Sequence, residues 1–345
     1  MRHAEHAVDH KSVWKTRMKH SNDEFSLISR FFSDVGSVGG PFSDESLVAL
    51  GIGDDCAVLR SVPDYDTCLS IDTLVCGVHF PENIAPDKLG YRCLAVSLSD
   101  LAAMGAHPTV FTLAITLPDN NAKWLEGFSQ GLSRIASEYG IRLVGGDTTR
   151  GPLTLSLQVH GLVPSGTAIK RSGARPGDLI CVTGVLGYAG AALDYLHVDD
   201  ASVLLKDNIQ HFLSRYYYPQ PRISTGIALR GLASAAIDIS DGLLADYNHI
   251  AEASGVGGVF YEKDIPLSNA LSVEVGDKAL SLALSAGDDY ELCFCIPESQ
   301  TKHLRDNTLF NDVLVIGKVS EAQGMIMIDG DGNEKNLSPK GYQHF

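Results

Sequence analysis

The chain has 345 residues, of which 44% are hydrophobic and 20% are charged, and its formal net charge at pH 7 is −15. This length and composition are typical of a globular protein with a large core, most simply divided into two domains. The negative charge excludes proteins that hold nucleic acid or an anionic membrane through non-specific basic patches. It does not exclude a nucleotide ligand, because bound metal ions can reverse the local sign of a site.

The sequence indicates neither a transmembrane helix nor a secretory signal. No apolar run approaches membrane-spanning length, and no charged segment followed by an apolar one opens the chain. The seven cysteines are scattered and form no Cys-x-x-Cys pair. We therefore expect a cytoplasmic protein whose cysteines are reduced.

The beginning of the chain differs in composition from the rest. Residues 1–17 are rich in His and basic residues and lack apolar periodicity, so we expect residues 1–22 to be a disordered extension. Apolar residues recur at helical spacing from Phe25 onward. We expect an N-terminal domain over residues 23–163 and a C-terminal domain over residues 164–345.

The first chemically informative stretch is Gly51-Ile-Gly-Asp-Asp-Cys-Ala-Val58, in which two glycines precede two adjacent carboxylates. A turn and a second apolar run, Cys68–Ile71, follow and predict a strand pair with acids at the strand ends. These acids are Asp54, Asp55 and Asp72. Three such carboxylates would repel one another unless a cation joined them, and oxygen ligands suit Mg²⁺. The alternative is a solvated acidic hairpin, which we favour only for Asp64 and Asp66.

Two more acids stand out in the first half. Pro86 opens a predicted helix that runs to about Met104, and Asp100 lies within its apolar sequence. A buried, unpartnered carboxylate there would be unfavourable, so a cation partner and a solvated turn position both remain open. A strand over Arg142–Val144 is expected to run into a loop over Gly145–Gly151, where Asp147 could hold metal beside a phosphate. A plain turn is the alternative.

The second half repeats the combination of glycines and acids. A predicted strand over Ala235–Ile239 leads into Ser240-Asp-Gly, so that Asp238 and Asp241 bracket a hydroxyl group at a strand-to-helix junction. Asp241 is equally compatible with a metal ligand and with a helix cap. Gly287-Asp-Asp-Tyr-Glu-Leu292 places paired acids at the start of another strand.

These features favour phosphoryl transfer without a covalent nucleophile. The chain has no Gly-x-x-x-x-Gly-Lys-Ser/Thr loop, no protein-kinase motif set, and no Ser or Cys in a recognisable triad. Acids at strand ends and glycine-rich loops in both halves could supply the metal ions and phosphate contacts that such a transfer needs.

The order of these motifs resembles that of the thiamine-monophosphate kinase family, within the aminoimidazole-ribonucleotide synthetase-like superfamily. The resemblance extends from about Phe25 to Phe345. Its motifs are Gly51–Val58, Asp72-Thr-Leu-Val-Cys-Gly-Val-His-Phe80, Leu94-Ala-Val-Ser-Leu-Ser-Asp-Leu-Ala-Ala-Met-Gly-Ala106, Gly145-Gly-Asp-Thr-Thr-Arg-Gly-Pro152, Arg171-Ser-Gly-Ala-Arg-Pro-Gly-Asp178, Ile237-Asp-Ile-Ser-Asp-Gly-Leu243 and Gly287–Leu292.

The resemblance implies an α+β fold with an N-terminal α/β-sandwich-like domain that dimerises through its sheet and a C-terminal α/β domain that closes over the site. It implies Mg²⁺-dependent transfer of the γ-phosphate of ATP to thiamine monophosphate, giving thiamine diphosphate. The implied metal ligands are Asp55, Ser70, Ile71, Asp72, Asp100, Asp147, Asp238 and Asp241. The implied ATP contacts are Gly146, Asp147, Arg171 and Ser240, and the implied contacts to thiamine monophosphate are His79, Asp288 and Tyr342.

The chain departs from the family pattern at two of these positions. Ile71 replaces the usual Thr, so it could serve a metal only through its backbone oxygen. Asp288 replaces a frequent Glu, which would shorten one contact to the substrate.

Alternatives remain open for the activity and for the assembly. An ATP-dependent synthetase of the same superfamily could act on another acceptor, although the reactive Cys and Lys expected of a selenophosphate synthetase are not apparent. A non-catalytic metal- and nucleotide-binding protein would not need so many carboxylates at loop ends. The strand Thr109–Leu117 is too apolar to be exposed, so it is either buried within one domain or part of a two-fold interface. We expect a homodimer.

Overall fold

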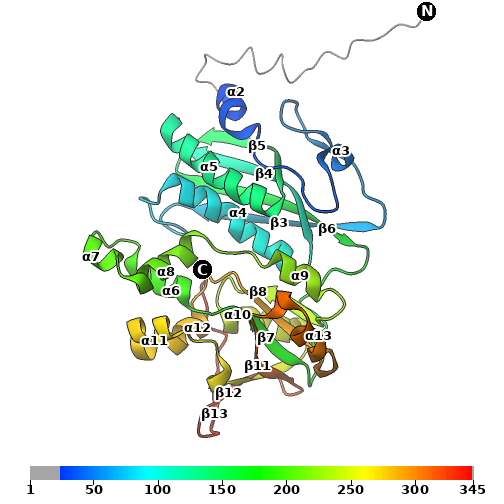
Figure 1. Cartoon of the computed structure of the whole chain (residues 1–345), viewed down its shortest axis with the longest axis vertical. Coiled ribbons are helices and arrows are strands. Elements are labelled where there is room, and N and C mark those ends of the chain that lie inside the picture. The colour runs from blue at the N-terminus through cyan, green and yellow to red at the C-terminus, as the bar shows by residue number, and fades with distance from the viewer. Residues whose placement is uncertain (1–23, 344–345) are drawn as a thin grey trace, which may run out of the picture.

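The computed structural model describes residues 24–343, except for the side chains of Glu24, Phe25 and Glu45. The chain folds around two β-sheets, one from each half of the sequence, with helices on them and between them (Figure 1). The predicted mixed α and β architecture is confirmed. The predicted disordered extension, residues 1–22, lies outside the described residues.

The first sheet has four strands in the order β3 (Tyr65–Val75), β6 (Thr154–Pro164), β4 (His107–Leu117) and β5 (Arg142–Arg150). Only β4 and β5 are parallel. Helices α4 (Pro86–Ala103) and α5 (Ala122–Tyr139) lie together over the sheet (Figure 1). Glycine at position 131 of α5 permits their close packing, because a Cβ there would lie 1.9 Å from the carbonyl oxygen of Asp87 in α4.

Strand β4 owes its apolar sequence to this packing. Phe111, Leu113 and Ile115 alternate with more exposed residues and are buried in the core that the helices share with the sheet. The strand therefore needs no partner chain to cover it. The other face of the sheet is open at its edge strand β3, where Leu69 and Ile71 are 57% and 64% exposed.

The N-terminal segment before this sheet contains short elements only. They are α2 (Glu24–Leu27), the π-helical turn Ile28–Phe32, α3 (Asp44–Leu47), β1 (Val48–Leu50) and β2 (Val58–Leu59). Strand β2 pairs with β1 and not with β3. The predicted hairpin between the two acidic runs is therefore wrong, and Asp72 lies within β3 instead of at its end.

The second sheet has seven strands in the order β13-β12-β9-β11-β7-β10-β8. Their bounds are β7 (Leu179–Thr183), β8 (Ala235–Asp238), β9 (Gly257–Tyr261), β10 (Leu292–Ile296), β11 (Val313–Ser320), β12 (Gly324–Ile328) and β13 (Glu334–Leu337). The helices of this half are α6 (Tyr188–Ala192), α7 (Ala201–Leu204), α8 (Asp207–Tyr217), α9 (Ile223–Leu229), α10 (Leu243–Ser254), α11 (Asn269–Val275), α12 (Ala279–Ser285) and α13 (Thr301–Asp306).

Helix α4 joins the two halves. It contacts α8, α9 and β8 of the second half as well as the first sheet. A Cβ at Gly226 of α9 would lie 2.0 Å from the carbonyl oxygen of Ala102, so glycine permits this close crossing. Between residues 24 and 343, no helix is both long enough and apolar enough to cross a membrane.

The segment Gly145–Gly151 is not the predicted loop. Most of it belongs to β5, which pairs along its whole length with β4. A Cβ at Gly146 would lie 1.9 Å from the carbonyl oxygen of Leu113. Gly146 therefore serves a close approach between two strands and not a change in chain direction.

Candidate active site

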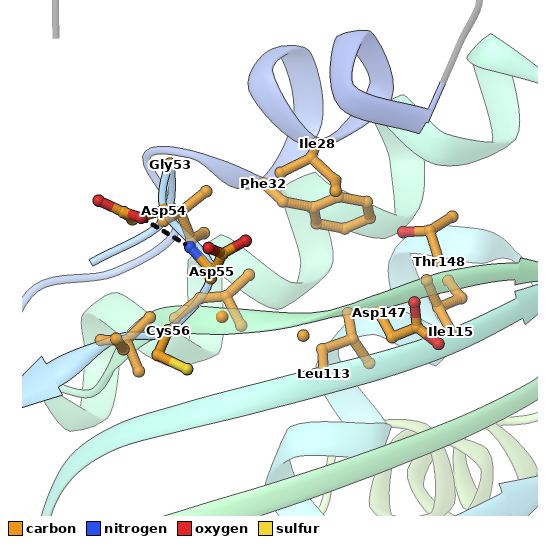
Figure 2. A pocket seen from close by; sticks show the side chains of 16 residues that line it. Ile28, Phe32, Gly53, Asp54, Asp55, Cys56, Leu113, Ile115, Asp147 and Thr148 are labelled. Atoms are coloured by element: carbon orange, nitrogen blue, oxygen red, sulfur yellow. Dashed lines mark hydrogen bonds between the residues drawn. The ribbon is translucent and has the colours of Figure 1, made fainter. Parts of the chain in front are cut away.

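A first cavity, with a volume of about 470 Å³, lies between the Gly53–Ala57 loop and residues Gly145–Thr148 of β5. Figure 2 shows Phe32 and Ile28 above it and Leu113 and Ile115 below, so its walls are largely apolar. The carboxylates of Asp55 and Asp147 belong to this lining (Figure 2). Apolar walls with carboxylates at the margin suit a ligand that has a flat ring at one end and metal-bound phosphates at the other.

The second cavity is larger, about 1180 Å³, and lies where the two halves of the chain meet. It is lined by β3, the following loop around His79, α4, the end of β8, and the segments around Asp288 and Tyr342. Its carboxylates are Asp72, Glu82, Asp100, Asp238, Asp241 and Asp288.

Three of these carboxylates, Asp72, Asp100 and Asp238, interact electrostatically, although they come from β3, α4 and β8. Burial, and then the charge of Asp100, raise the pKa of Asp72 to about 6. Burial, and then the charge of Asp100, also raise the pKa of Asp238 well above its usual range. Burial raises the pKa of Asp100, opposed by a hydrogen bond from Ser70 and by the positive charge of Arg171. The raised pKa values show that the negative charges of these three carboxylates are not balanced by the positive charge nearby.

The loop Ser240–Gly242, one residue after β8, is held by a residue that the sequence analysis did not identify. One oxygen of Asp246, Oδ2, accepts hydrogen bonds of 3.0 Å from each of the backbone N–H groups of Ser240, Asp241 and Gly242. The carbonyl oxygens of the loop are used as well. Ser240 O accepts from the N–H of Asp288 at 2.8 Å, and Asp241 O accepts from the N–H of Tyr342 at 3.0 Å. The loop therefore holds the segments around Asp288 and Tyr342 in place.

His79 and Asp288 have defined orientations. His79 Nδ1 accepts a hydrogen bond of 3.0 Å from the N–H of Val75, so the neutral ring carries its proton on Nε2. Asp288 Oδ1 accepts from Arg92 at 2.6 Å and from the hydroxyl of Tyr290 at 3.0 Å. Arg92 was not singled out from the sequence because it lies in no acidic or glycine-rich motif, and Tyr290 was passed over because only the acids of Gly287–Leu292 drew attention.

The structure divides the predicted site residues into two groups. Asp55, Gly146 and Asp147 line the first cavity. Ile71, Asp72, His79, Asp100, Asp238, Ser240, Asp241, Asp288 and Tyr342 line the second, and Ser70 and Arg171 lie close to Asp100. Asp54, Asp55 and Asp72 are therefore not brought together as expected. Among residues 24–343, no three acidic, His or Cys side chains are grouped so that they alone could hold a metal ion.

Comparisons with known proteins agree with the two-part architecture. Residues 53–163 match the family model of the AIR synthase related protein, N-terminal domain, and residues 175–330 match that of its C-terminal domain. The chain is 46% identical over 327 residues to thiamine-monophosphate kinase of Salmonella typhimurium, covering 93% of this chain and 98% of that protein.

Two solved structures extend the similarity to the fold. The crystal structure of thiamine-monophosphate kinase from Stenotrophomonas maltophilia is 41% identical, with a TM-score of 0.77, over 83% of this chain and 92% of that one. A structure described as AaThiL complexed with AMPPCP and TMP is 30% identical, with a TM-score of 0.73, over 83% of this chain and 89% of that one. On its sequence and its fold, this chain belongs to the thiamine-monophosphate kinase family.

Proposed function

We propose that this protein transfers the γ-phosphate of ATP to thiamine monophosphate, which is the last step in the synthesis of thiamine diphosphate. A phosphate oxygen of thiamine monophosphate forms the new bond to the γ-phosphorus, the bond from that phosphorus to the β–γ bridging oxygen breaks, and ADP leaves. The observation that carries the proposal is the composition of the second cavity, in a chain that belongs to this family. There the cluster of Asp72, Asp100 and Asp238 shares one space with His79, Asp288 and Tyr342.

The chemistry of the cluster fits Mg²⁺. The available donors are carboxylate and hydroxyl oxygens, which magnesium prefers, and their mutual repulsion calls for a cation. Magnesium usually takes one or two carboxylates and completes its shell with water and phosphate, so a ready-made group of three side chains is not required. When bound, it would neutralise the charge that develops on the phosphate oxygens. We assign Asp72, Asp100, Asp238 and Asp241 to this role, with Ser70 supporting Asp100.

The remaining predicted residues divide between the two substrates. Gly146 offers backbone groups to ATP and Ser240 offers a hydroxyl group. Arg171 interacts with Asp100 and is therefore close enough to contact the phosphates of ATP. His79, Asp288 and Tyr342 form the acceptor side. Phosphate oxygens of the acceptor are already ionised near neutral pH, so the transfer needs positioning and charge stabilisation more than a general base.

A comparison of acceptors tests this proposal. We expect thiamine diphosphate to form when the protein is given ATP, Mg²⁺ and thiamine monophosphate, and no phosphorylated product when unphosphorylated thiamine is the acceptor. Aminoimidazole-ribonucleotide synthesis from its formylated precursor is the control for another activity of the superfamily. Turnover of that precursor, without turnover of thiamine monophosphate, would contradict the proposal.

We further propose that the protein is a homodimer whose partner completes each active site. Strands β3 and β5 are the two edges of the first sheet. Asp72, on β3, pairs with Leu157, and the same row continues through Leu113 to Gly146, on β5. Three strand spacings separate the ends of this row by about 14 Å. The two groups of predicted ligands therefore lie far apart in one chain.

A second copy could place its first cavity beside the second cavity of its partner. The open face of the sheet supports this arrangement, because Leu69 and Ile71 expose large apolar side chains on it. The apolar side chains of β4, which from the sequence could have formed either a core or an interface, are buried within their own chain and do not carry the proposal.

Mixing two inactive variants tests whether the site is shared. Asp72→Asn and Asp147→Asn each disable one group of ligands. If partners complete each other, a dimer of one variant with the other has one fully native site, and random exchange of subunits restores about a quarter of wild-type activity. If each chain holds its own site, the mixture stays inactive.

The location we propose is the cytoplasm. All seven cysteines are free thiols, which is typical of a reducing compartment, and ATP is the co-substrate.

A further inference from the structure

Arg92, on helix α4, is a buried cation on the wall of the second cavity. Its side chain is only 2% exposed. One terminal nitrogen donates to Asp288 Oδ1 at 2.6 Å, and the other donates to the backbone oxygen of Tyr216 at 2.7 Å. The guanidinium carbon also lies 4.0 Å from the centre of the Tyr216 ring. These contacts all reach from the first half of the chain to the second.

The segment that Arg92 contacts has an unusual backbone. Asp288 and Tyr290 have φ values of +70° and +50°, and Asp64 is the only other non-glycine residue with positive φ in the part of the chain that the structure describes. Such conformations are unfavourable for residues with a Cβ and persist where the surroundings hold them. Here, the N–H groups of Asp288 and Tyr290 donate to Ser240 and Ile239, each at 2.8 Å.

Arg92 and the Tyr290 hydroxyl share one acceptor. Both donate to Asp288 Oδ1, so neither occupies Oδ2 of the same carboxylate. The backbone bonds fix where Asp288 is placed, and these two side-chain bonds fix how its carboxylate is turned within the cavity. Two donors on a single oxygen hold an orientation better than one, because rotation about the side chain would break both.

Helix α4 also carries Asp100, eight residues after Arg92. At the rise of an α-helix this spacing is about 12 Å. One rigid element therefore sets the distance between the acidic cluster, which we assign to metal and phosphate, and the carboxylate that we assign to the acceptor.

We propose that Arg92 is a positioning residue for the acceptor: it orients Asp288 so that the free side of the carboxylate faces thiamine monophosphate. This inference depends on the function proposed above. Arg92 itself does not touch the substrate, because its guanidinium is buried and both terminal nitrogens are already engaged.

Two variants test the assignment. Arg92→Lys keeps the charge but cannot donate to Asp288 and Tyr216 with the same planar fork. Tyr290→Phe removes only the second donor to Asp288. We expect Arg92→Lys to raise KM for thiamine monophosphate by about tenfold and Tyr290→Phe to raise it by about threefold, while KM for ATP changes by less than about twofold. Arg134→Lys is the matched control, because Arg134 stacks on Tyr91 and Tyr218 and makes no contact with Asp288.

The outcomes separate the inference from its alternatives. Equal rises in both KM values, or no rise, in a folded Arg92→Lys variant would show a purely structural ion pair. A large effect of Arg92→Lys with no effect of Tyr290→Phe would show that Arg92 acts without Asp288. If Arg92→Lys does not fold, Tyr290→Phe alone decides, and an unchanged KM for thiamine monophosphate overturns the inference. Wild-type protein that is inactive with thiamine monophosphate would instead reject the proposed function.

Discussion

Replacing Asp246 by Ala should release the Ser240–Gly242 loop, which is hydrogen-bonded to Asp288 and Tyr342. Asp246 is buried, and its Oδ2 accepts all three N–H groups of the loop. Burial raises the pKa of Asp246 to about 7, so the carboxylate is charged above that pH. There, loss of this charged acceptor by the buried N–H of Gly242 costs about 1.5–3 kcal/mol. Ser240 and Asp241 are half-buried and can bond to water instead, so we assign about 1 kcal/mol to the two together.

The sum, about 2.5–4 kcal/mol, predicts a local and not a global effect. Hydrogen exchange followed by mass spectrometry measures it directly. The amides of residues 240–242 should exchange about 60-fold to about 700-fold faster in Asp246→Ala than in the wild type. Asp246→Asn keeps an uncharged acceptor of the same shape and should accelerate exchange by only about tenfold.

A control on the same helix tests the specificity of this effect. Asn248 donates to Glu252 at 2.8 Å on the exposed side of α10, and Asn248→Ala should leave exchange in the loop unchanged. KM should rise for both substrates in Asp246→Ala, because the loop carries Ser240 and fastens Asp288 and Tyr342. Native exchange rates in a folded Asp246→Ala variant would refute the reasoning.

Three further predictions concern the metal cluster, the assembly and the pH dependence of stability. Asp72→Asn keeps the shape of the side chain but removes charge, so turnover at saturating Mg²⁺ should fall by about 100-fold or more; steady-state kinetics checks this, and near-native turnover would show that Asp72 is not a ligand. Ile71→Glu puts charge on the open sheet face, so light scattering should shift toward the monomer mass of 37.0 kDa, whereas an unchanged mass would place any interface elsewhere. Burial raises the pKa of Asp289 to about 8, so the folded state holds a proton that the unfolded state releases near its ordinary pKa. Wild-type stability should therefore fall relative to Asp289→Asn as pH rises from 5 to above 8, and parallel melting curves across that range would contradict the assignment.

Elements with strong local periodicity were predictable from the sequence. Helix α4 and strand β4 lie within a few residues of the predicted ranges, because each has a long apolar sequence that the core buries. Helix α8 was missed although its signal is present, since Ile209, Phe212 and Tyr216 recur at helical spacing and are buried.

Pairing between strands was less predictable. The turn before Tyr65 favoured a local hairpin, but β3 pairs instead with β6, some 90 residues later. The glycines of β5 favoured a loop in the sequence. The close approach of Gly146 to Leu113, which requires a glycine, exists only in the folded sheet and could not be predicted. Local sequence does not distinguish a glycine that turns the chain from one that admits a neighbour.

The candidate site shows the same division. Motifs identified acidic and glycine residues that line the two cavities, but not the residues that hold these segments in place. Arg92 and Asp246 act through contacts that depend on folding: Arg92 reaches a residue 196 positions later, and Asp246 is one acid among many until its three N–H partners are known. The separation of Asp72 from Asp147, which lie on opposite edges of the first sheet, likewise follows from strand order alone.

Transfer of a labelled phosphate tests the central claim most directly. Purified protein is mixed with ATP labelled in its γ-phosphate, Mg²⁺ and thiamine monophosphate, and the label is followed in a single turnover. The proposed direct transfer predicts that label lost from ATP appears one for one in the terminal phosphate of thiamine diphosphate, with none on the protein at any time. Label released as inorganic phosphate, or held on the protein before product forms, would contradict it.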